Sequence, residues 1–74
     1  MPKIAVLVED PDGSRLLASE SEREVALMTE SVIDRIAPSA LPVPIWVHCA
    51  DTTVLTRLTS YFAGVQDELV ADVP

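Results

Sequence analysis

Apolar residues follow two patterns along the chain: short continuous runs and stripes with helical spacing. The runs Ile4–Val8 and Ile45–Val47 are rich in β-branched residues and lie next to residues typical of turns, so each predicts a buried strand. Between the two runs, apolar residues recur every three or four positions, which is typical of one face of a helix. They are Val25, Met28, Val32 and Ile36. The pattern therefore predicts two strands separated by an amphipathic helix.

A second helical stripe follows the run Ile45–Val47. Asp51 suits the N-cap of this helix because its carboxylate can accept hydrogen bonds from the first free amides. The apolar positions of the stripe are Leu55, Leu58, Phe62, Val65 and Leu69. Gly64 leaves two alternatives. Either the helix ends at Ala63 and residues 68–71 form a closing strand, or the helix continues through the glycine at a cost of about 1 kcal/mol.

The segment between the first strand and the first helix has two interpretations. Pro11 and Gly13 predict a turn, and Asp-Gly between two apolar runs is a strong hairpin signal. We therefore favour a second strand over Ser14–Ala18. In the alternative, Leu16 and Leu17 already belong to the first helix.

The boundaries of the first helix follow from its capping residues. Ser19 and Ser21 are each followed three residues later by a glutamate, so either serine can start the helix with a capping box, and Pro38 ends it. Together the elements predict one domain over residues 1–74, an α/β two-layer sandwich in the order ββαβα, with two helices on one face of a small sheet. The alternative order is βαβαβ, a three-stranded sheet closed by a strand at residues 68–71.

Size and composition limit how this domain can be stabilised. A domain of 74 residues buries only about 60% of the surface that its unfolded chain exposes, so it is marginally stable without a cross-link or a partner. One cysteine and one histidine exclude an intrachain disulfide and a four-ligand structural zinc site. We therefore expect a protein partner, which includes a second copy of the chain, and no cofactor.

The formal net charge is −7, and the five basic residues are scattered along the chain. This balance repels phosphate backbones, so we expect no nucleic-acid partner. The longest uncharged stretch, residues 36–50, contains several prolines and falls short of the roughly 18 apolar residues of a membrane span. The first residues lack a secretory signal pattern and the lone thiol suits a reducing compartment, so we expect a cytoplasmic protein with no membrane partner.

The sequence His48-Cys49-Ala50-Asp51 lies where a strand passes into a helix. The positive end of a helix dipole lowers the pKa of a nearby thiol, so Cys49 suits a thiol-dependent enzyme or redox protein. A strand, however, directs His48 and Cys49 to opposite faces, which separates the thiol from the imidazole. We therefore expect Cys49 to be a small residue packed at a strand end, without catalysis or metal binding.

Acidic residues gather at the turn after the first strand. Glu9 and Asp10 offer the hard oxygen ligands that suit Mg²⁺ or Ca²⁺. Because acidic residues at a turn more often stay solvated, we expect no metal there. The candidate ligand or thiol residues are therefore Glu9, Asp10, His48, Cys49 and Asp51.

The stripe on the second helix is the main candidate for an interaction surface. Its spacing suits packing against another helix at a shallow angle. We expect Trp46 on the preceding strand to be a core residue, and an aromatic interface anchor is the alternative. The predicted interaction surface consists of Leu55, Leu58, Tyr61, Phe62, Val65, Leu69 and Trp46. Packing of the stripe on the sheet of its own chain is the simpler expectation, and dimerisation or docking through it is the functional one.

Two parts of the chain resemble a response-regulator receiver domain. Residues 3–10 (KIAVLVED) resemble the first receiver strand with the acidic pair that holds Mg²⁺. Residues 43–51 (VPIWVHCAD) and 63–70 (AGVQDELV) resemble the fourth strand, the fourth helix and the start of the fifth strand. Cys49 takes the place of the switch serine or threonine, and neither the phosphoacceptor aspartate nor the lysine after the last strand has a counterpart. The resemblance implies a shortened receiver-like unit without phosphorylation, in which the two apolar strands pair in parallel and bring the acidic pair and Cys49 to one edge of the sheet.

These observations fit best a small acidic, non-catalytic regulatory or protein-interaction module that acts as a homodimer or docks to a larger protein. The small core and the long apolar stripe motivate this expectation. A receiver-like signalling domain without phosphorylation is one alternative, and a thiol-dependent enzyme or redox protein that uses Cys49 is another.

Overall fold

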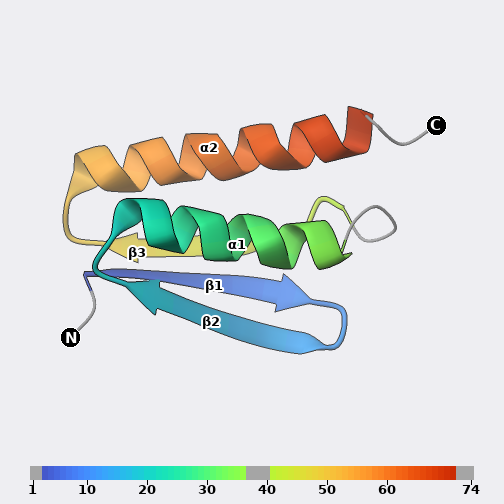
Figure 1. Ribbon diagram of the computed structural model, residues 1–74, viewed down its shortest axis with the longest axis horizontal. Coiled ribbons are helices and arrows are strands. Elements are labelled where there is room, and N and C mark those ends of the chain that lie inside the picture. Colours follow the sequence, from blue (N-terminus) through green and yellow to red (C-terminus); the bar gives the residue numbers. More distant parts are fainter. Residues whose placement is uncertain (1–2, 37–40, 72–74) are drawn as a thin grey trace.

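The structure is a computed structural model that describes residues 3–36 and 41–71. Over these ranges the elements follow the predicted order ββαβα (Figure 1). They are β1 (Ile4–Asp10), β2 (Gly13–Ser19), α1 (Glu22–Ile36), β3 (Ile45–Cys49) and α2 (Thr52–Ala71). The hairpin interpretation is therefore confirmed, and Leu16 and Leu17 belong to β2. Pro38, the predicted end of the first helix, lies outside the described residues.

The hairpin between β1 and β2 is closed by local chemistry. Asp10 pairs with Gly13, whose φ of 142° lies in a region that L side chains rarely adopt. Inside the turn, the amide of Asp12 donates to Asp10 Oδ1 over 2.8 Å, and Arg15 Nε donates to Asp10 Oδ2 over 3.0 Å. The Asp-Gly signal therefore corresponds to a turn in which the carboxylate of Asp10 accepts hydrogen bonds from Asp12 and from Arg15.

Both helices start at polar caps. Ser21 Oγ accepts the amide of Glu24 over 3.2 Å, and Asp51 Oδ1 accepts the amide of Thr53 over 2.9 Å. Helix α2 then runs through Gly64 to Ala71, so the closing strand at residues 68–71 and the βαβαβ order are wrong. Apolar residues on both sides of the glycine pack against the core, and this packing offsets the cost of a helical glycine.

The three strands form an antiparallel sheet in the order β2-β1-β3, and both helices lie on one of its faces (Figure 1). Side chains of the central strand that face the helices are fully buried, as the alternation of a one-sided sheet requires. The buried apolar core consists of Ile4, Val6, Val8, Val25, Val32, Ile33, Val43, Leu58 and Phe62. Within this core, α1 contacts β1 and β2, whereas α2 contacts β3.

The pairing of β1 with β3 differs from the receiver-like expectation. Ile4 lies opposite Cys49 and Val8 lies opposite Ile45, so the two strands are antiparallel rather than parallel. The hairpin is the reason: β2 returns the chain to the start of β1, α1 carries it to the far end again, and β3 must then run against β1. Cys49 consequently lies at the opposite end of β1 from Glu9 and Asp10.

Candidate functional site

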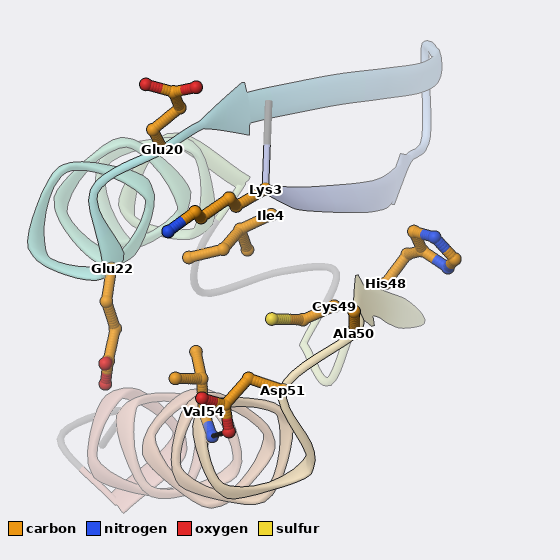
Figure 2. A pocket seen from close by; sticks show the side chains of 9 residues that line it. All are labelled: Lys3, Ile4, Glu20, Glu22, His48, Cys49, Ala50, Asp51 and Val54. Atoms are coloured by element: carbon orange, nitrogen blue, oxygen red, sulfur yellow. Dashed lines mark hydrogen bonds between the residues drawn. The ribbon is translucent and has the colours of Figure 1, made fainter. Parts of the chain in front are cut away.

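The candidate functional residues near Cys49 surround an open pocket at one end of the sheet. The pocket has a volume of about 580 Å³ and lies between the start of β1, the end of β3 and the first turns of both helices (Figure 2). The thiol of Cys49 points into it, toward Ile4 and Val54, whereas His48 points away to the other face of the sheet. The predicted separation of His48 from Cys49 is therefore confirmed, and the half-buried thiol lies among apolar side chains.

Two of the carboxylates at the rim of this pocket, those of Glu22 and Asp51, have structural partners. Glu22 accepts hydrogen bonds from Nε and Nη2 of Arg57, the second over 2.6 Å, and this contact ties the start of α1 to α2. The hydrogen bonds lower the pKa of Glu22 and raise the pKa of Arg57. Asp51 caps α2, and the ammonium group of Lys3 extends between Glu20 and Glu22 (Figure 2). The pocket therefore lies where the two helices begin, and an ion pair and a helix cap hold these helix starts in place.

The other candidate ligand residues do not join Cys49. Glu9 is exposed at the far end of β1, and the carboxylate of Asp10 serves the hairpin turn. The hydrogen bond from the amide of Asp12, followed by that from Arg15, lowers the pKa of Asp10. Among the described residues, no group of three or more His, Cys, Asp and Glu side chains is arranged to hold a metal ion.

The apolar stripe on α2 is largely used by the chain itself. Leu58 and Phe62 are each only 2% exposed and belong to the core, and Val65 and Leu69 pack against it. Their burial removes the centre of the predicted interaction surface, because a side chain inside the core cannot contact a partner. Leu55 is half-buried as well.

Tyr61 and Trp46 are the exposed members of the predicted surface, at 40% and 52% of their area. The hydroxyl of Tyr61 donates to Glu30, which joins α2 to α1 and raises the pKa of Tyr61. Trp46 lies on the face of the sheet that the helices leave uncovered, so the prediction of a core tryptophan is wrong. Its position follows from pairing with Leu7, whose neighbours Val6 and Val8 point to the core.

This uncovered face, called the open face below, carries an apolar row across all three strands. The strand register places Leu16 opposite Leu7 and Leu7 opposite Trp46, and Leu16 is 70% exposed. The strand side chains of the open face are Ala5, Leu7, Glu9, Ser14, Leu16, Ala18, Trp46 and His48. Sequence reasoning did not assign Leu16 to this row. The signal was the pair Leu16-Leu17, because consecutive residues of a strand point to opposite faces.

Comparison with known proteins adds no relative from which a function could be transferred. No protein-family model matches the chain, and no curated protein or solved structure is significantly similar to it. Within residues 3–36 and 41–71, neither helix combines the length and the apolar character that a membrane crossing requires.

Proposed function

We propose that this protein is a small acidic, non-catalytic protein-interaction module that acts as a homodimer through its open face. The observation that carries the proposal is an apolar row across the sheet, in which Leu16 and Trp46 are exposed and Leu7 between them is half-buried. Isolated exposed apolar side chains are normal on protein surfaces, but a contiguous apolar row marks an interaction site. We propose a cytoplasmic location for the module, because a lone free thiol suits a reducing environment.

The distribution of charge favours a second copy at this face. Each chain carries a net charge of −7, so two copies repel each other unless they meet where charge is sparse. Glu9 is the one formally charged strand side chain of the open face within the described residues. Face-to-face packing of two sheets leaves the acidic residues of both helix layers and of the hairpin turns in water.

The dimensions of the open face set the expected strength of the dimer. Three strands span about 14 Å and seven residues span about 24 Å, so the flat footprint is about 340 Å² per copy. Side-chain relief increases the accessible area, but the total buried by two copies stays near or below the roughly 1,200 Å² at which stable complexes begin. We therefore expect a reversible dimer with a dissociation constant in the micromolar range.

Sedimentation equilibrium over a wide concentration range tests the homodimer. We expect the mass to rise from that of one chain to that of two, and to rise at lower concentration when added salt screens the repulsion between the acidic copies. Because Trp46 is the single tryptophan, its fluorescence emission should shift to shorter wavelength together with the mass. A monomer at every concentration would refute the homodimer, and a stable complex with a larger protein would assign the open face to that partner instead.

A further inference from the structure

Strand β3 lies at an edge of the sheet, and the backbone groups on its outer side have no backbone partner within residues 3–36 and 41–71. The carbonyl of Pro44 accepts the amide of Glu9 over 3.0 Å, which sets the phase of the ladder between β3 and β1. Successive residues of an antiparallel strand turn their amides and carbonyls to opposite sides. Ile45, Val47 and Cys49 therefore direct both groups away from β1, along the outer edge of the sheet.

Over Ile45–Cys49 this edge lacks two of the features that normally prevent strand addition, charged side chains and prolines. Natural edge strands are blunted by charged side chains, prolines, bulges or a covering segment. Strand β3 contains neither a charged residue nor a proline over Ile45–Cys49. The opposite edge, β2, carries Arg15 and begins at Gly13. The two edges therefore differ, and β3 is the edge at which an added strand can pair.

The helix layer is wider than the sheet that it covers. Two packed helices lie about 8–10 Å apart and together cover about 20 Å, whereas three strands at about 4.8 Å cover about 14 Å. Helix α1 contacts both β1 and β2, but within the sheet α2 contacts β3 alone. Figure 1 shows α2 as the outermost element on the β3 side of the molecule. Helix α2 therefore has room beneath it for one more strand.

A groove lies at this place, between β3 and α2, and its lining is mainly apolar with polar atoms from Thr59 and Gln66. It has a volume of about 230 Å³, and its walls include Ile45 and Val47 of β3 and Thr59, Phe62 and Ala63 of α2. None of the residues that line it is charged. A strand added beside β3 would direct alternate side chains into the groove and form backbone hydrogen bonds with the outer groups of Ile45, Val47 and Cys49.

We propose that β3 binds an extended segment of another protein as a fourth strand, with small or medium apolar side chains at alternate positions and positively charged flanks. The net charge of −7 supplies the preference for cationic flanks. A second copy of this chain does not fit this edge, because in a β3–β3 pair both α2 helices would have to cover the same two strands, which accommodate about one helix. This inference goes beyond the proposed homodimer and uses a different surface.

Binding of a synthetic peptide tests strand addition. The probe is a fluorescein-labelled peptide of alternating valine and threonine with two lysines at each end, and the control peptide has prolines in place of the threonines. We expect saturable binding of the probe, measured by fluorescence anisotropy, and at least about tenfold weaker binding of the control, because proline cannot donate to the ladder. No binding at millimolar probe, or equal binding of both peptides, would overturn the proposal.

Matched variants on α2 locate the site. Ala63→Arg fills the groove, whereas Ser60→Arg adds the same charge to the same helix at an exposed position outside it. We expect Ala63→Arg to weaken probe binding by at least about tenfold and Ser60→Arg to change it less than about threefold. Equal effects of the two variants would mean that probe binding depends on charge alone, and would refute the assignment of the peptide to the groove. Thr59→Arg provides the same comparison if Ala63→Arg does not fold.

Amide hydrogen exchange separates this site from the homodimer. Probe binding should slow exchange of the outward amides of Ile45, Val47 and Cys49, while Ala63→Arg leaves the sedimentation mass unchanged. Slower exchange confined to β2 would refute the assignment to β3. A protein that is monomeric at every concentration but still binds the probe would refute the proposed homodimer and leave strand addition intact.

Discussion

Replacing Leu16 by serine tests the open face with a magnitude that follows from the structure. Complete burial of a leucine side chain contributes about 1.5–3 kcal/mol, and 70% of Leu16 is exposed in the single chain and free to be buried by a partner. The substitution therefore removes about 1–2 kcal/mol per copy and about 2–4 kcal/mol per symmetric dimer. The dissociation constant should rise by about 30-fold to 1,000-fold.

Leu27→Ser is the matched control for this substitution. Leu27 is 56% exposed on α1, on the far side of the molecule from the open face, so the same chemical change leaves the dimer contact intact. Sedimentation equilibrium of both variants gives the two dissociation constants, and thermal unfolding checks that each chain stays folded. Equal effects of the two substitutions, or a Leu16→Ser variant that dimerises like the parent protein, would refute the reasoning.

Three further predictions concern stability and ionisation within the chain. Thr29 is fully buried, and within the described residues its hydroxyl has no hydrogen-bond partner, so Thr29→Val should raise the free energy of unfolding by about 1–3 kcal/mol in urea denaturation. The lowered pKa of Glu22 means that its contact with Arg57 stabilises the fold above the unfolded-state pKa near 4.5 and ceases to do so as the pH falls through the lower folded-state value. Arg57→Gln should therefore flatten the loss of thermal stability below pH 4.5, and an unchanged acid limb would contradict the assignment. The raised pKa of Tyr61 means that its bond to Glu30 stabilises the fold below the unfolded-state pKa near 10.0 and is lost as the pH rises through the higher folded-state value; Glu30→Gln should move the phenolate absorbance titration to lower pH.

Local chemistry accounts for the parts of the fold that could be predicted from the sequence. The hairpin follows from Asp12-Gly13, and the starts of both helices follow from Ser21 and Asp51. Each of these signals acts within a few residues, so it does not depend on what the rest of the chain does. The continuation of α2 through Gly64 could not be decided locally, because it depends on packing of the following residues against the core.

The surfaces were harder to predict because they depend on long-range pairing. Trp46 lies in a short run in which every residue is apolar, so its face is decided only by the register with β1. Likewise, the stripe of α2 suits a partner helix or the sheet of its own chain equally well. In the structure Leu58 and Phe62 of this stripe pack in the core, and the apolar row of the open face lies on the strands instead.

The two proposed surfaces share β3, so their occupation should be coupled. A fourth strand beside β3 would extend the open face next to Trp46 and widen it from about 14 Å to about 19 Å, which increases the area that two copies can bury against each other. Saturating valine–threonine peptide should therefore lower the dissociation constant of the dimer. Because coupling free energies are reciprocal, dimerisation must tighten peptide binding by the same factor. Sedimentation equilibrium with and without peptide, and peptide titrations of the parent protein and of Leu16→Ser, measure the two factors. A dimer that dissociates when peptide binds would show that the added strand obstructs the open face and would refute this geometry.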